Sequence, residues 1–320
     1  MWSGWDVATQ KGPAVGDTDV AEVWRNHRRW SSTANRLKKE IVLWRSTALV
    51  LAIVGAVLAT LATQVGTDTV AGRWASGLAA VALALVPVIR ATRLGRSAIE
   101  TWTRARSASE ALKALVYVRL TWTPPEGTSD PEAGLPRDAE LRRAAHVILR
   151  DVGDLEGQTL GVPDDDAPVP SVTDVGSYVE RRVQPQIDGF YRRSAEKEQK
   201  RLRLFRRVEL VLSLLGAVLG AAAATTGTDA VAAWVAVVTT VGAAITAHIA
   251  AARYEHHVIS YLATARQLRF LVREWRSGGD SGPDAATRLV QECEDVISRE
   301  NESWMAAWSR DDGPPPPTTA

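Results

Sequence analysis

The sequence is poor in cysteine and phenylalanine, and it has no excess of charge of one sign. Cys293 is its only cysteine, which excludes a disulfide framework and a cysteine-based metal site. A lone cysteine fits a reducing compartment for the soluble parts. Lysine and arginine (38) nearly balance aspartate and glutamate (37), so we expect no nucleic-acid partner. The first 40 residues are polar and charged, so no cleavable signal peptide is expected.

Catalytic and cofactor-binding motifs are missing as well. The sequence has no G-x-x-x-x-G-K-[ST], G-x-G-x-x-G or H-E-x-x-H motif. The adjacent residues His256 and His257 would point in different directions on a helix, so a shared metal is not expected. No paired carboxylates and no nucleophile with a neighbouring base stand out. The sequence therefore predicts a protein that is not an enzyme and that has no cofactor and no metal.

Four long stretches contain no charged residue, and they dominate the chain. They cover residues 46–67, 74–89, 210–228 and 230–252. About 20 helical residues cross the hydrocarbon core of a bilayer. The alternative is a soluble helical core, but a soluble helix would show a polar face, and these stretches have none. The pattern predicts an all-α membrane protein with transmembrane helices at about 46–67, 74–92, 208–228 and 230–252.

Basic residues flank these stretches on one side only. Arginines and lysines crowd residues 25–45 and 192–207 and follow the second and fourth stretches, whereas the two connecting turns hold only Arg73. By the positive-inside rule both hairpins turn outside and both chain termini lie in the cytoplasm. We therefore predict a multi-pass protein of the bacterial cytoplasmic (inner) membrane, with the lipid bilayer as its first partner.

Each connecting turn contains the tripeptide Gly-Thr-Asp. The residues concerned are Gly66 and Asp68 in the first turn and Gly227 and Asp229 in the second. Glycine gives the backbone the freedom that a tight turn needs, and aspartate is a common helix N-cap. A role of the two aspartates in binding an anion or a metal is the alternative interpretation.

The turns repeat because the domain is duplicated. Shifting the chain by 161 positions places residues 49–68 on 210–229 with 11 identities in 20, and after the turn the shift becomes 160. Tryptophan, arginine and lysine positions also coincide, which a chance match of apolar residues does not explain, so we predict a tandem duplication. The predicted domains are 18–153 and 176–310, two tandem copies of a two-transmembrane hairpin with long cytosolic helical extensions. An acidic, Pro/Gly-rich linker (154–175) joins them, and the ends (1–17 and 311–320) are predicted to be disordered.

The exit helix of each copy is expected to run on from the membrane into the cytoplasm, and in the second copy this extension has an apolar seam. Its residues recur at alternating spacings of four and three, and they are Tyr254, Val258, Tyr261, Ala265, Leu268, Val272 and Trp275. This a/d pattern predicts coiled-coil-like packing near the membrane. The seam fits an intramolecular bundle with the basic entry helix, and also an interface between copies of the chain. A capping box of Ser177 and Glu180 is expected to restart the helix after the linker.

Small residues are spaced for close helix contact in the first span of each copy. Gly216 and Gly220 form a G-x-x-x-G motif, and Gly55 with Ala59 forms its counterpart. They fit packing within a hairpin or between the copies, and also assembly of a homo-oligomer. Separately, His248 lies near the inner end of the fourth span, where an ionisable group is a functional hypothesis; its counterpart Val88 in the first copy weakens that hypothesis.

The second half of the chain resembles a known bacterial family. The segments YVERRVQPQIDGFYRRSAEKE (178–198), LRFLVREW (268–275) and VISRENESWMAAW (296–308), together with the hairpin, are similar to SLATT domains, the SMODS- and SLOG-associating two-transmembrane effectors. The first half is similar but degenerate: RRWSSTA (28–34) matches FYRRSA loosely, and Tyr178–Gln186 has no counterpart.

The resemblance implies a function that residue patterns alone do not. SLATT domains are proposed to form membrane pores or lesions in nucleotide-signalled bacterial conflict systems. For this chain it implies an oligomeric pore-forming or membrane-perturbing effector, triggered by a nucleotide-signalling or sensor protein encoded nearby. The alternative is a non-enzymatic membrane anchor or scaffold that recruits a partner through its cytosolic coiled-coil-like helices.

Overall fold

Helices make up all of the regular structure in the computed structural model, which describes residues 15–122, 135–163, 167–278 and 283–310; within these ranges there is no strand. The all-α prediction is therefore confirmed. The helices are α1 (Val15–Val65), α2 (Val70–Arg93), α3 (Arg96–Thr121), α4 (Leu135–Asp151), α5 (Val175–Tyr178), α6 (Arg193–Thr226), α7 (Asp229–Ala252), α8 (Tyr254–Arg276) and α9 (Pro283–Arg310). A 3₁₀ segment, η2 (Gly153–Thr159), follows α4, and two π-helical segments, η3 (Val179–Val183) and η4 (Pro185–Arg192), lie between α5 and α6.

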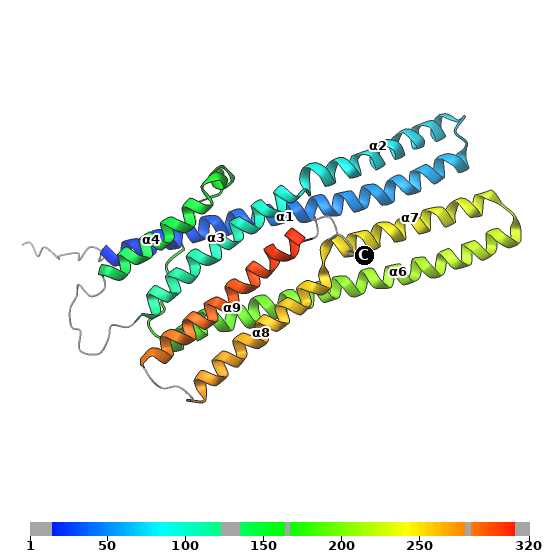
Figure 1. Ribbon diagram of the computed structural model, residues 1–320. Coiled ribbons are helices and arrows are strands. Elements are labelled where there is room, and N and C mark those ends of the chain that lie inside the picture. Colours follow the sequence, from blue (N-terminus) through cyan, green and yellow to red (C-terminus); the bar gives the residue numbers. More distant parts are fainter. Residues whose placement is uncertain (1–14, 123–134, 164–166, 279–282, 311–320) are drawn as a thin grey trace, which may run out of the picture. The chain divides into compact units, whose positions relative to one another are not determined.

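Four of these helices are long and apolar enough to cross a membrane, as predicted. They form two hairpins, α1–α2 and α6–α7, each closed by a short turn (Figure 1). Helix α1 runs for 51 residues without a break, and α5, η3, η4 and α6 follow one another from Val175 to Thr226. Each entry helix therefore continues from its basic, polar half directly into its apolar half.

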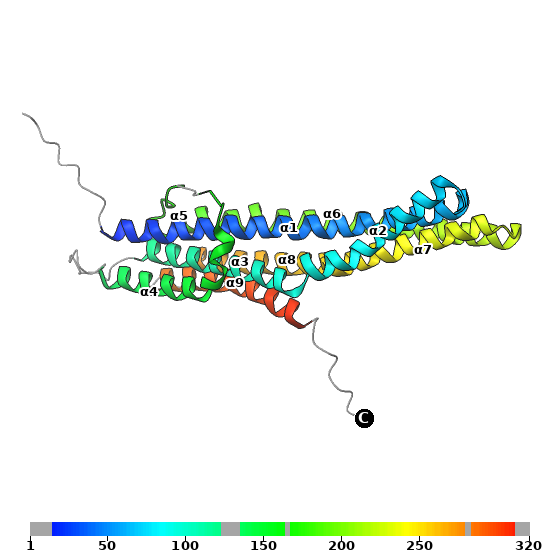
Figure 2. The ribbon, with the colours of Figure 1, turned by 90° about the horizontal axis from the view of Figure 1, so that it is seen from above.

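The exit helices are interrupted, although the sequence predicted that they continue. Helix α2 ends at Arg93 and α3 starts at Arg96, with the break at Leu94 and Gly95 (Figure 2). At the matching place in the second copy, Arg253 separates α7 from α8 in a left-handed conformation with a φ of 49°. Pro87 lies inside α2, which continues for six more residues. The expected continuity was wrong in both copies.

The compact units of the chain cut across the two sequence copies. One unit contains residues 1–34, 103–184 and 270–320, and the other contains residues 35–102 and 185–269. The first unit thus combines the ends of both copies that lie away from the hairpins, and the second combines both hairpins with the adjacent helix segments. The domains delimited by sequence describe the duplication, whereas the packing joins equivalent parts of the two copies.

Local boundaries differ in three places from those expected. Helix α1 begins at Val15, so the last residues of the segment predicted as disordered are helical; residues 1–14 and 311–320 lie outside the described residues. The linker begins with the 3₁₀ segment η2, which Arg104 fixes through a 2.7 Å ion pair with Asp154. The capping box after the linker is formed by Asp174 and Ser177, because Asp174 accepts from the Ser177 amide and the Ser177 hydroxyl accepts in return. The expected Ser177–Glu180 box was wrong.

Candidate functional site

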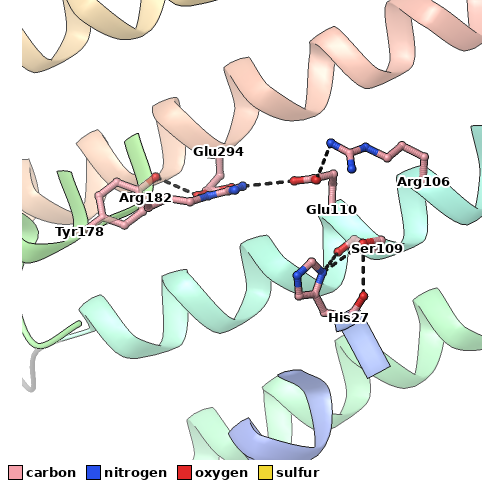
Figure 3. A network of polar contacts seen from close by, with 7 residues as sticks. All are labelled: His27, Arg106, Ser109, Glu110, Tyr178, Arg182 and Glu294. Atoms are coloured by element: carbon pink, nitrogen blue, oxygen red, sulfur yellow. Dashed lines mark hydrogen bonds and ion pairs between the residues drawn. The ribbon is translucent and has the colours of Figure 1, made fainter. Parts of the chain in front are cut away.

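A buried polar network occupies the unit formed by residues 1–34, 103–184 and 270–320 (Figure 3). Its members come from both copies of the domain. Helices α1 and α3 of the first copy contribute His27, Arg106, Ser109 and Glu110, and α5, η3 and α9 of the second copy contribute Tyr178, Arg182 and Glu294. We call these seven residues the Arg182 network.

Arg182 is the centre of the network. Its side chain is 1% exposed, and its Nε and Nη2 donate to the two carboxylate oxygens of Glu294 at 2.9 and 2.8 Å. Nη2 also reaches Glu110 on α3 of the first copy at 3.5 Å. A bidentate guanidinium–carboxylate pair fixes orientation as well as charge. Arg182 therefore links the two copies through one buried cation.

Aromatic rings surround this cation. The guanidinium lies 5.2 Å from the ring centroid of Tyr117 on α3, a cation–π geometry. The Tyr117 ring packs edge-on against the rings of Tyr178 and Trp24, with centroid separations of 5.8 and 6.2 Å. The hydroxyl of Tyr178 donates to Glu294 at 2.9 Å. The rings and the carboxylates together hold Arg182 in one position.

The buried charges shift one another's pKa. Burial alone would raise the pKa of Glu110, but Arg106, Lys113 and Arg182 outweigh it and lower the pKa to about 2. Arg106 pairs with Glu110 at 2.8 Å, one helical turn away. Burial, followed by the positive charge of Arg182, lowers the pKa of Lys113 to about 8. Glu110 is therefore ionised at neutral pH, as a partner of Arg182 must be.

His27 attaches α1 to α3. Its Nδ1 lies 2.8 Å from the Ser109 carbonyl oxygen, and because a carbonyl can only accept, Nδ1 carries the proton. The Ser109 hydroxyl also lies 3.1 Å from Nδ1 and donates to the His27 carbonyl at 3.3 Å. Burial and the nearby Lys113 lower the pKa of His27 to about 4. The ring is thus neutral at physiological pH.

The π-helical turns explain how Arg182 reaches the interior. Five buried apolar residues recur at a spacing of four along this stretch: Val179, Val183, Ile187, Tyr191 and Ala195. In an α-helix this spacing drifts by about 40° per step around the axis. The wider i→i+5 turns of η3 and η4 compensate for the drift, so these residues stay on one face. The strict spacing of four was visible in the sequence, and sequence reasoning missed both it and Arg182.

The network couples helices of the two copies. Its ionisable groups are buried and engaged with one another, and the only network side chain with appreciable exposure is Arg106. Among the described residues, no group of three His, Cys, Asp or Glu side chains is placed to hold a metal. Cys293, next to Glu294, is buried, and burial raises the pKa of its thiol to about 12, which makes it a poor nucleophile.

The small residues predicted for helix packing have different surroundings in the two hairpins. A methyl group added to Gly55 would lie 2.7 Å from Leu83 of α2, so α1 and α2 approach closely there; Ala59, one turn further on, is half-buried. A methyl on Gly216 would meet Val238 of α7 at 3.5 Å, an ordinary contact, and one on Gly220 would meet nothing within 4 Å. Gly220 thus has no close intramolecular neighbour on its Cβ side.

The four turn residues lie at the tips of the hairpins. Gly66 and Gly227 have positive φ values of 92° and 63°, which glycine adopts without strain. The N-cap of α2 is Thr69, whose hydroxyl accepts from the Gly72 amide at 3.0 Å, so the expected cap by Asp68 was wrong. Asp229 is the first residue of α7, where the positive end of the helix dipole stabilises its negative charge.

The apolar seam of α8 faces the interior of the chain. Tyr254, Tyr261, Ala265, Leu268 and Val272 are buried, and Val258 and Trp275 are half-buried. The Tyr261 ring packs against the rings of Tyr191 and Phe190, with centroid separations of 6.0 and 5.8 Å. This burial within one chain favours the intramolecular interpretation of the seam.

His248 lies in an aromatic contact at the inner end of α7. Its ring centroid is 5.0 Å from that of Phe205 on α6, and its Nε2 lies 3.2 Å from the hydroxyl of Tyr254. With Leu202 and Ala252, these residues form a small cluster that closes the inner end of the second hairpin. The contacts assign His248 a packing and hydrogen-bonding environment.

Two different family models match two separate parts of the chain. The family model of the SMODS and SLOG-associating 2TM effector domain 1 matches residues 178–304, and that of a protein of unknown function (DUF4231) matches residues 27–122. Neither curated proteins nor solved structures gave a match. The effector-domain match begins at Tyr178 and so includes Arg182 and Glu294. Residues 178–304, which make up most of the second copy, therefore match the SLATT two-transmembrane effector domain, as the resemblance predicted.

Proposed function

We propose that this chain is an oligomeric membrane-perturbing effector of a bacterial conflict system and that it acts without enzymatic chemistry. It would lie in the cytoplasmic membrane with both termini in the cytoplasm, where a nucleotide-signalling or sensor protein encoded nearby would act on its cytosolic helices. The match of residues 178–304 to a two-transmembrane effector domain supports an effector at a membrane.

The observation that carries the proposal is the exposure of α6. In the most apolar continuous segment of 18 residues in this helix no residue is buried, whereas the corresponding segment of each of the other three spans is partly buried. Gly220 has open space beside it among the described residues, and Leu214 and Val218, on the opposite side of the helix, are exposed. In lipid, close approach of small residues drives helix association. We infer that α6 contributes its exposed surface, Gly220 included, to contacts between chains.

Membrane depolarisation on expression tests the proposal. Expression should lower the membrane potential reported by a voltage-sensitive dye, and the double variant Gly216→Leu/Gly220→Leu should abolish the effect while leaving membrane insertion intact. Gly77→Leu on α2 is the matched control, because Gly77 also has open space beside it and its substitution should leave depolarisation unchanged. An unchanged potential at every expression level and with co-expressed neighbouring genes would contradict the proposal.

The scaffold alternative predicts a different outcome. A membrane anchor would cause no ion flux, and a partner protein would co-purify with the chain. Because the seam of α8 is buried within the chain, such a partner would have to bind other surfaces of the cytosolic helices.

A further inference from the structure

One nitrogen of the buried Arg182 guanidinium has no hydrogen-bond partner. Nε and Nη2 donate to Glu294, and Nη2 also reaches Glu110 (Figure 3). Nη1 carries two N–H groups, is buried, and donates to no acceptor among the described residues. The Arg182 side chain is 1% exposed, so bulk water does not reach this atom. A buried donor without an acceptor costs free energy, and in folded proteins such donors are normally satisfied by an ordered water or an ion.

Lys113 brings a second positive charge to the same place. Glu110, Lys113 and Tyr117 follow one another on α3 at spacings of three and four, so they share a helix face. Glu110 lies 3.5 Å from Arg182 Nη2, and the ring centroid of Tyr117 lies 5.2 Å from the guanidinium. Lys113 stands between these two contacts along the helix, so its ammonium can reach the Arg182 guanidinium. The positive charge of Arg182 contributes, after burial, to the lowered pKa of Lys113, in agreement with this placement.

The carboxylates of the network are already paired with other cations. Glu294 forms its bidentate pair with Arg182, and Glu110 pairs with Arg106 at 2.8 Å. No hydrogen bond or ion pair joins the Lys113 ammonium to another of the residues that the structure describes. Three cations thus stand against two carboxylates. A water molecule beside Nη1 would satisfy the donor and leave this excess charge in place, whereas an anion offsets both costs.

We propose that a small monovalent anion such as chloride binds between Arg182 Nη1 and the Lys113 ammonium. The anion accepts hydrogen bonds from Nη1 and forms an ion pair with Lys113. Because Nη1 is buried, the occupant is small, and because Lys113 is only half-buried, its side chain leads from the site to solvent. The two cations come from η3 of the second copy and α3 of the first, so the bound anion strengthens the contact between the copies. This binding site goes beyond the proposed effector function and does not depend on it.

The chloride dependence of the unfolding temperature tests the site. The purified chain is heated in detergent at increasing chloride concentration, with gluconate replacing chloride so that the ionic strength stays constant. Gluconate is too large for a buried position, so the unfolding temperature should rise by roughly 2–4 °C as chloride replaces it and then reach a plateau. An unfolding temperature that does not respond to chloride overturns the proposal.

Substitutions of Lys113 separate the site from general effects of salt. Lys113→Met should fold, because it removes a half-buried cation that has no carboxylate partner, and it should abolish the rise. Lys113→Arg keeps the positive charge and should retain the rise. Lys39→Met is the matched control, since it removes the same charge from an exposed position, and it should respond to chloride as the parent protein does. An equal rise in Lys113→Met and in the parent protein overturns the proposal.

Bromide provides a direct readout of the position. It replaces chloride in sites of this kind and scatters X-rays anomalously, so crystals grown in sodium bromide should show an anomalous peak within hydrogen-bond distance of Arg182 Nη1. A water molecule at this position, without anomalous signal, overturns the proposal. Neither measurement depends on the membrane potential, so failure of the anion site and failure of the effector function are distinguishable.

Discussion

The two copies of the domain share a sequence pattern but occupy different positions in the packing. Helix α3 of the first copy has no exposed residue between Thr101 and Leu120, whereas the buried residues of α8 in the second copy are Thr264 and members of the seam. The same helix is thus a central element in one copy and a peripheral one in the other. The two helices share a sequence pattern, and Arg182 of η3 covers α3 at Glu110 and Tyr117.

Individual contacts show the same divergence. His27 and Ser109 of the first copy correspond to Asp188 and Arg269 of the second under the shifts of 161 and 160. The first pair is a buried hydrogen bond of 2.8 Å, and the second is a half-exposed ion pair of 3.4 Å. A contact between entry and exit helix persists at the same place, but its chemistry has changed from neutral to ionic. This is what is expected when one copy becomes buried and the other stays solvated.

Removal of Arg182 should have the largest effect on stability, because Arg182 links the two copies. Arg182→Met leaves the buried carboxylate of Glu294 without its bidentate cation, while Glu110 keeps its pair with Arg106, and losing one partner of a buried ionic network costs about 3–5 kcal/mol. We expect a lower unfolding temperature of the purified protein in detergent and faster proteolysis of the cytosolic helices.

The adjacent Arg181 is the matched control for this substitution. It is exposed and donates only to the Ser171 hydroxyl, so Arg181→Met should change the unfolding temperature little. Equal effects of the two substitutions would show that the network does not hold the copies together.

Acidification should affect the stability of the two equivalent contacts differently. The pKa of His27 is lowered to about 4 in the fold from an ordinary value of 6.5, so the unfolded state binds more protons between these values. The stability contributed by neutral His27 is complete above pH 6.5 and is lost as the pH falls towards 4, by about 3 kcal/mol.

Substitution at both equivalent positions checks this origin. His27→Asn can still donate to the Ser109 carbonyl but cannot titrate, so the thermal stability of this variant should vary less between pH 7 and pH 4. Asp188→Asn, which removes a half-exposed pair worth about 0–1 kcal/mol, should keep the pH profile of the parent protein. A wild-type profile for His27→Asn would assign the pH dependence to other groups.

Leucine at the equivalent glycines Gly55 and Gly216 should give the smallest difference in stability between the two copies. Overpacking of a tight contact costs about 1–3 kcal/mol, and Gly55 already lies against Leu83. Gly55→Leu should therefore destabilise the first hairpin more than Gly216→Leu destabilises the second, measured as retained folded fraction after heating in detergent. The opposite order would mean that α6 is packed more tightly than α1.

Residue patterns predicted the hairpins and the duplication because both depend on local, repeated features. Charge-free stretches of membrane-spanning length, glycine in the turns and a shift of 161 positions can be read along the chain without knowing any contact. The exact helix starts were less predictable: Thr69 and Asp174 cap helices for which Asp68 and Ser177 were expected, because neighbouring polar residues compete for the same amides.

The Arg182 network could not be predicted from the sequence. Arg182 lies among many arginines of the basic entry helix, and nothing in its local sequence distinguishes it from the exposed Arg181. Its burial depends on π-helical turns and on partners 72 and 112 positions away. The sequence by itself determined the membrane hairpins and their duplication, since these follow from hydropathy and local repetition. Only the tertiary structure decided which copy is central, because burial of a charge depends on side chains brought together from distant parts of the chain.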